Sequence, residues 1–173
     1  MRKIIIFAIL AVIAFGIEGC EQRVKVLKTG ESYIDKVYKF KVSPPNKSWS
    51  IAVMPRQKYK AQFISMRNSV DSFLNINISV KESRFSNLSD YADSIKKQIN
   101  SFNPDSLDEK RAYLKGIEAY NVTSVFKSSY NIGCYFLNDG SQYSIVFSGS
   151  DSAQIEKYRK EFDEVLNSFE FVK

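Results

Sequence analysis

Few residue types that could support catalysis or metal binding occur in this chain of 173 residues, which has two cysteines and no histidine. The absence of histidine excludes Ser-His-Asp and Cys-His catalysis and the usual zinc sites. The seven glycines are too dispersed for a phosphate-binding loop or a dinucleotide fingerprint. A pair of catalytic carboxylates remains open, because the sequence favours no one pair over another. We therefore expect a protein that is not an enzyme and has no cofactor.

The densest acidic group in the sequence is Asp105, Asp108 and Glu109. Its spacing does not match the calcium-binding loop of an EF-hand, and Lys110 and Arg111 follow it directly. A solvated turn explains such a group better than a metal site does. We predict no metal site.

The N-terminal segment has the layout of an export signal. Arg2 and Lys3 precede an apolar run over residues 4–17, and small Gly19 stands before Cys20. As a helix the apolar run would extend about 21 Å, which is short of a hydrocarbon core of ~30 Å. This length argues against an uncleaved transmembrane helix, whereas an ordinary secretion signal fits the run equally well. Cys20 must therefore discriminate between secretion and anchoring.

The sequence from Ile17 through Glu18 and Gly19 to Cys20 resembles the lipobox of bacterial lipoproteins. The resemblance implies cleavage after Gly19 and acylation of Cys20, including its thiol, as in palmitoylated envelope proteins. Glu18 departs from the pattern, because the family normally has a small uncharged residue there. Since Glu21 rather than Asp follows Cys20, the family's sorting logic favours the outer membrane, facing the periplasm, if the cell has one. Otherwise we expect the outer face of the cytoplasmic membrane.

We divide the chain into a lipoprotein signal peptide at 1–19, the lipidated Cys20 with a polar tether at 20–36, and one domain at 37–173. The domain is long enough to bury a core without disulfides. Once Cys20 is acylated, Cys134 is the only thiol left, so no internal disulfide forms. Its apolar, strand-like surroundings predict a buried and unreactive thiol.

Basic residues are scattered, with two local groups. The first, Arg23, Lys25 and Lys28, follows the anchor and could lie against anionic lipid headgroups. The second is Arg56, Lys58 and Lys60. This group alternates with polar and aromatic residues and could suggest nucleic-acid binding. Export and the lack of a nucleic-acid-binding motif argue against that function. A lysine-rich edge strand is the better interpretation, and we expect no nucleic-acid partner.

Hydrophobic periodicity predicts several strands, a helix, several strands and a final helix. The predicted segments are strands at 38–42, 49–53, 62–66, 73–81, 111–114, 117–127, 131–137 and 142–147, and helices at 88–102 and 152–167. Asn87 and Asp151 are the expected helix caps, and Asp139-Gly140 is a strong hairpin signal. Most connections between strands are short, so we predict an α+β domain with a mainly antiparallel sheet whose faces are covered by two amphipathic helices.

The aromatic residues are numerous, with ten tyrosines and 13 phenylalanines. Most fall on the predicted buried faces, so we assign them to the core rather than to a binding surface. Tyr59, Tyr113 and Tyr135 fit that assignment least well.

Four segments have a characteristic order and spacing: residues 38–51 with a proline-rich turn, the helix start at 87–91, the strand start at 116–120 and the C-terminal segment at 162–171. Together they resemble the PsbP-like superfamily, which includes bacterial envelope lipoproteins of the DcrB type. The resemblance implies an α/β/α sandwich and a role in docking or assembly, and it carries over no binding residue.

From these observations we expect a membrane-anchored envelope protein that binds a protein partner without catalysis. The alternative is a binding protein for a small apolar or lipid ligand in a pocket between sheet and helix. An enzyme that uses carboxylates or serine alone is the least favoured class. A deep aromatic cavity would favour the ligand-binding alternative, and a filled core with an exposed surface would favour docking.

Overall fold

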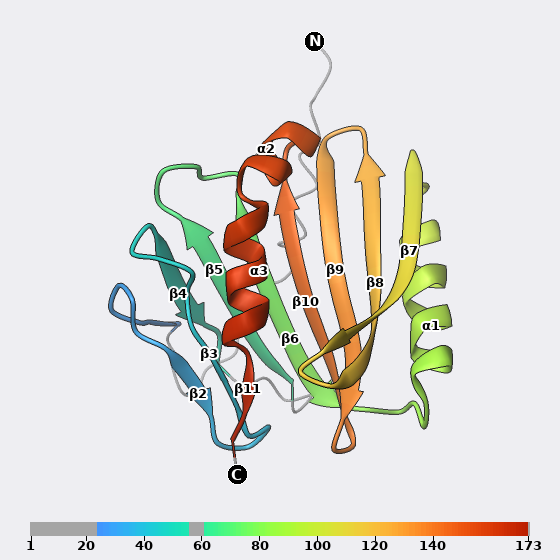
Figure 1. The fold of residues 1–173 in the computed structure, drawn as a ribbon, viewed down its shortest axis with the longest axis horizontal. Coiled ribbons are helices and arrows are strands. Elements are labelled where there is room, and N and C mark those ends of the chain that lie inside the picture. Colours follow the sequence, from blue (N-terminus) through green and yellow to red (C-terminus); the bar gives the residue numbers. More distant parts are fainter. Residues whose placement is uncertain (1–23, 56–60, 173) are drawn as a thin grey trace, which may run out of the picture.

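Eight strands pair into one large sheet. Figure 1 labels β4 to β10 of this sheet. The computed structural model describes residues 24–55 and 61–172. The order across the sheet is β1-β4-β5-β6-β10-β9-β8-β7, and each neighbouring pair is antiparallel. The bounds of these strands are β1 Lys25–Val26, β4 Trp49–Val53, β5 Gln62–Asn68, β6 Asn75–Glu82, β7 Ser106–Leu114, β8 Ile117–Phe126, β9 Ser129–Asn138 and β10 Ser141–Gly149. The predicted α+β class with a mainly antiparallel sheet is confirmed.

Two tight turns fix how the C-terminal strands pair. Lys115 and Gly116 join β7 to β8 with φ values of 51° and 83°, and Asp139 and Gly140 join β9 to β10 with values of 47° and 70°. A two-residue hairpin in which both residues have positive φ twists in the same sense as the strands it connects. The predicted Asp-Gly hairpin is therefore confirmed, and the turn at Gly116 belongs to the same class.

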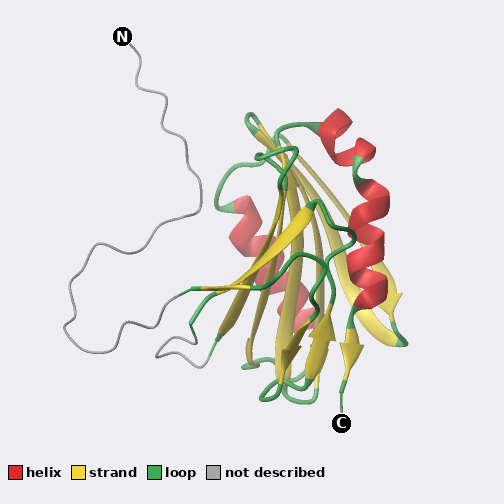
Figure 2. Ribbon diagram, turned by 90° about the vertical axis from the view of Figure 1, so that its left-hand side faces the viewer, coloured by secondary structure: helices red, strands yellow, loops and turns green. Residues whose placement is uncertain are grey.

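Helices cover the two faces of the sheet from opposite sides (Figure 2). α1 (Leu88–Asn100) packs on β8 and β9, while α2 (Ser152–Lys157) packs on β10 and β9 from the other face. α3 (Arg159–Ser168) continues from α2 and contacts β3. The predicted arrangement of helix, sheet and helix in layers is thus confirmed, although the final helix is divided at Tyr158.

Both predicted helix caps form. The Asn87 side chain accepts a hydrogen bond from the Asp90 N–H at 2.9 Å, and Asp151 accepts one from the Gln154 N–H at 2.9 Å. These bonds satisfy N–H groups that have no partner in the first turn of a helix.

The main core lies between the large sheet and the layer formed by α2 and α3. Alternate residues of β6 point into it, as the sequence predicts, and Ile76, Ile78 and Val80 are each at most 1% exposed. Aromatic rings fill the centre: Phe136 stacks on Tyr143 with 4.8 Å between ring centroids. A second, smaller cluster lies between the sheet and α1.

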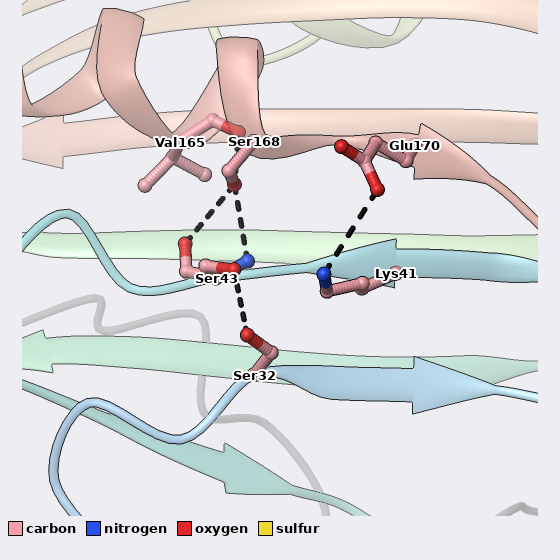
Figure 3. Close-up of polar contacts among 6 residues, drawn as sticks. All are labelled: Ser32, Lys41, Ser43, Val165, Ser168 and Glu170. Atoms are coloured by element: carbon pink, nitrogen blue, oxygen red, sulfur yellow. Dashed lines mark hydrogen bonds and ion pairs between the residues drawn. The ribbon is translucent and has the colours of Figure 1, made fainter.

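A small second sheet closes the main core beside α3. Its order is β11-β3-β2, with β2 at Tyr33–Asp35, β3 at Phe40–Val42 and β11 at Glu170–Phe171. Ser168 links this sheet to α3, as Figure 3 shows: its Oγ accepts from the Ser43 N–H at 3.0 Å and lies 2.8 Å from the Val165 carbonyl oxygen. The Ser43 hydroxyl in turn lies 2.8 Å from that of Ser32. The C-terminal residues are thereby attached to the N-terminal strands.

The folded body begins earlier than the predicted boundary at residue 37. β1 pairs with β4, β2 pairs with β3, and Leu27 is buried in the main core. Strands of two and three residues are too short to produce a clear periodic pattern, so part of the segment expected to be a tether, Lys25–Val26 and Tyr33–Asp35, is in strands. Among the described residues, no helix is both long and apolar enough to cross a membrane.

Candidate functional site

The residues predicted to carry the membrane anchor, Gly19 and Cys20, lie outside the described residues. The same holds for Arg56, Lys58 and Lys60.

Cys134 lies on β9 and is 3% exposed. Burial raises the pKa of its thiol to about 12, so the reactive thiolate is scarce near neutral pH. The predicted buried thiol is confirmed, and its environment gives it no chemical role.

Two hollows on the described surface are the best formed. One of about 140 Å³ is bordered by Tyr38, Asp139 and Phe171, and one of about 220 Å³ is bordered by Asp93, Glu109 and Tyr120. Pockets for small-molecule ligands usually measure ~300–1,000 Å³. Neither hollow has room for a ligand of that size.

The second hollow adjoins a polar network between α1, β7 and β8. Glu109 accepts from the Lys96 ammonium at one carboxylate oxygen and from the Tyr120 hydroxyl at the other. These donors hold the pKa of Glu109 below its usual value, Lys96 making the larger contribution, and the hydrogen bond to Glu109 raises the pKa of Lys96. Burial, followed by the Glu109 carboxylate, raises the pKa of Tyr120. The carboxylate therefore stays charged and occupied by donors, which suits attachment of α1 to β7 better than proton transfer.

Arg111 forms a second link at the same place. Its guanidinium donates to Ser89 at 3.2 Å and to Glu118 at 3.4 Å, and it lies 5.9 Å from the centre of the Tyr120 ring. Arg111 and Glu109 both belong to β7, so the strand is held to the helix at two neighbouring positions. The predicted solvated acidic turn is thus partly a strand, because Asp108 and Glu109 lie within β7. No group of three metal-ligating side chains occurs in the described ranges.

β7 is the outer strand at one end of the large sheet. Six of its nine residues are exposed, and within the described ranges it pairs with β8 alone. Tyr113 is 77% exposed. Of the three tyrosines that fitted the core poorly, Tyr113 is thus at the surface, Tyr135 is buried at 8% exposure, and Tyr59 lies outside the described residues.

The turn at Lys115 and Gly116 determines which backbone groups of β7 point outward. In a two-residue hairpin the closing pair, here Leu114 and Ile117, exchanges both backbone hydrogen bonds. Because this pattern alternates along a strand, the even-numbered residues of β7 bond to β8. The N–H and C=O groups of Leu107, Glu109, Arg111 and Tyr113 therefore point away from the sheet. This edge could accept a further strand, and we call β7 together with the facing side of α1 the docking edge.

α1 covers only part of one face of the large sheet. On the same face, strands β1, β4, β5 and β6 carry no helix from the described part of the chain. The register places mostly small, polar and basic side chains there, together with the apolar Val26 and Phe63, and we call this surface the open face. Its members are Val26, Ser50, Ala52, Phe63, Ser65, Arg67, Asn75, Asn77, Ser79 and Lys81. None of these side chains is acidic, and Arg67 and Lys81 are exposed.

The sequence matches no protein-family model and no curated protein. Among solved structures, the fold is similar to the solution structure of cyanobacterial PsbP (CyanoP) from Synechocystis sp. PCC 6803, with a TM-score of 0.61 and 14% identity over 92% of this chain and 98% of that one. It is also similar to a crystal structure from Bacteroides thetaiotaomicron VPI-5482, with a TM-score of 0.53 and 16% identity over 84% of this chain. This match covers 49% of the Bacteroides chain, so our chain spans about half of that protein's length. At these identities the likeness concerns the fold alone: the chain has a PsbP-like fold.

Proposed function

We propose that this chain is a lipid-anchored protein of the bacterial cell envelope that binds a protein partner at the docking edge and has no catalytic activity. The lipobox-like context of Cys20 supports the anchor, and the outer membrane facing the periplasm is the favoured location. The absence of histidine from the sequence and the PsbP-like fold support a binding role of the DcrB type.

One observation carries the proposal for the docking edge: β7 offers four residues with outward backbone groups, and exposed Tyr113 is one of them. An unpaired edge attracts other strands, and proteins usually guard such edges with charged side chains. Two of the four charged side chains of β7, Glu109 and Arg111, are held on the α1 side by Lys96 and Ser89. A strand from a partner could add to β7 by main-chain hydrogen bonds, with Tyr113 contributing side-chain contact.

The alternative function, binding of a small apolar or lipid ligand between sheet and helix, has less support. The two surface hollows are small, and rings occupy the space between sheet and α3. Finding a tightly bound lipid or apolar molecule, and no protein, with the purified chain would favour this alternative.

The anchor is tested by mass spectrometry of the full chain purified from cell membranes. Replacing Cys20 with Ser removes the acylated thiol, so the variant should retain its signal segment and lose the acyl chains that mass spectrometry detects on the mature protein. Acylation holds a protein in a membrane at about 0.8 kcal/mol per buried methylene. Wild-type protein that still has its signal segment and carries no acyl chain on Cys20 would contradict the anchor.

Docking is tested by placing a photoreactive amino acid at Tyr113 in intact cells. We expect a crosslinked product with one protein partner, and no such product from the same amino acid at Val70, which is equally exposed at 78% but lies between β5 and β6. Tyr113→Pro removes an outward N–H and should reduce partner binding more than Tyr113→Thr, which removes only the ring. Equal crosslinking at Tyr113 and Val70 would contradict the docking edge.

A further inference from the structure

The distance between the proposed anchor and the folded body is short. Only residues 21–23 separate Cys20 from Val24, where the described chain begins. Four residue steps span at most about 14 Å when fully extended. If Cys20 is acylated, as proposed above, the start of β1 must stay that close to the lipid headgroups.

β1 is the outer strand at the end of the sheet opposite β7, and the large sheet ends there in the described part of the chain. Figure 2 views the molecule from this side. Three apolar side chains are exposed at this edge and on the adjoining open face: Val24 is 48%, Val26 is 65% and Phe63 is 38% exposed. Val26 and Phe63 lie on one face, because Val26 is opposite Ala52, Ala52 is opposite Ser65, and Phe63 is two residues from Ser65 on the same strand.

The charges around these apolar side chains are mainly basic. Lys25 and Lys28 are exposed on and beside β1, and exposed Arg67 lies on the open face beyond Ser50. One carboxylate is close, since Glu31 accepts the backbone N–H of Lys28 at 3.1 Å. Three basic side chains around exposed apolar residues match the chemistry of an anionic membrane surface, where phosphate groups lie just outside the acyl chains.

We propose that the β1 edge is a membrane-contact surface that binds anionic phospholipid headgroups through Lys25, Lys28 and Arg67 and inserts Val24, Val26 and Phe63 among them. This proposal rests on the lipid anchor at Cys20. The anchor fixes the protein to the membrane, and the β1 edge fixes its orientation. α1 projects from the same face of the sheet, so the body meets the membrane at this edge rather than flat on the open face.

The test measures orientation in the intact, acylated protein. The full chain is produced with its signal, purified from membranes and reconstituted in vesicles of phosphatidylcholine with phosphatidylglycerol, some of whose headgroups carry a nitroxide quencher. A fluorophore is attached at Ser50→Cys, near β1, or at Asp108→Cys, on β7, because both positions are exposed and Cys134 is buried. We expect severalfold stronger quenching at position 50 than at position 108.

Three changes sharpen the test. Each of Lys25→Gln, Lys28→Gln and Arg67→Gln should lower the preference for this orientation about fivefold, as a loss of about 1 kcal/mol per basic residue requires. Vesicles of phosphatidylcholine alone should reduce the difference between the two labels, and so should a flexible Gly-Ser insertion after Arg23. Lys160→Gln, at an exposed site on α3, is the matched control and should change nothing.

Equal quenching at positions 50 and 108, in protein that still floats with the vesicles, would overturn the membrane-contact surface and leave the anchor intact. Failure of the wild-type protein to float with the vesicles would instead overturn the anchor, and the proposal with it.

Discussion

Phe169 is the side chain through which the C-terminal segment should contribute most to stability. It is fully buried at the end of α3, and its ring stacks on Phe40 of the small sheet at 5.1 Å between centroids. It also meets Phe136 and Tyr143 of the large sheet edge-to-face at 5.8 Å and 5.9 Å. One ring therefore joins both sheets to the helix layer.

Replacing Phe169 with Ala removes this ring and leaves a cavity that rigid neighbours cannot fill. Phe→Ala substitutions in cores cost about 3–5 kcal/mol, and each lost aromatic pair adds ~0.5–1.5 kcal/mol to simple burial. Because four such pairs disappear, the fourth being with Phe171 at 5.4 Å between centroids, we expect a loss near the top of the range, about 4–5 kcal/mol. For a domain of this size each kcal/mol lowers the Tm by roughly 2–4 °C, so the Tm should fall by about 8–20 °C.

Urea unfolding followed by circular dichroism and tryptophan fluorescence measures this loss, since Trp49 is buried in the same core. The matched control is Phe73→Ala, because Phe73 is 73% exposed and its removal should change the free energy of unfolding by less than about 0.5 kcal/mol. A loss below about 1 kcal/mol for Phe169→Ala would refute the reasoning, because a core ring cannot cost so little to remove. That result would mean that the small sheet and α3 do not unfold together with the large sheet.

Two further predictions concern ionisable groups. Glu109→Gln should destabilise the protein only slightly at neutral pH, because the Lys96–Glu109 pair lies at the surface. Folding lowers the pKa of Glu109, so the stability that its carboxylate contributes is complete above the pKa of the unfolded chain. This stability is lost as the pH falls through the lower pKa of the folded protein. The unfolding curves of wild type and variant should therefore converge in acid. Cys134 should react with a thiol reagent in urea but not in native protein, because burial raises its pKa to about 12; rapid modification of the native protein would contradict this.

The sequence predicted the elements that have their own local signal. The alternation along β6, the caps at Asn87 and Asp151, and the turn at Asp139 each depend on neighbouring residues alone, and all three are present. The first half of β7 was missed, because its run of charged residues from Asp108 to Arg111 shows no apolar alternation. Pairing with β8 makes it a strand, which is an effect of tertiary context that no local pattern reveals.

The candidate site was less predictable for the same reason. Lys96, Glu109 and Tyr120 are separated by 13 and 11 residues, and only the packing of α1 against β7 and β8 brings them together. The sequence indicated only weakly that Tyr113 is exposed, because this tyrosine fitted the predicted core poorly. The outward backbone groups beside it follow from the turn at Gly116, which the sequence marked only as a break.

The two proposed surfaces lie at opposite edges of one sheet, and this separation has a mechanical consequence. β1 and β7 are seven strand spacings apart, which is about 34 Å at the usual distance between strands. A continuous antiparallel sheet with helices packed on it is rigid, so it keeps the distance between its two edge strands constant, whereas a flexible tether would not. An anchor held close to β1 would therefore fix the place of the docking edge relative to the membrane, and a partner strand would be met at one defined distance from the lipid surface. Lengthening the tether should consequently weaken partner capture at Tyr113 even though no residue of the docking edge has changed.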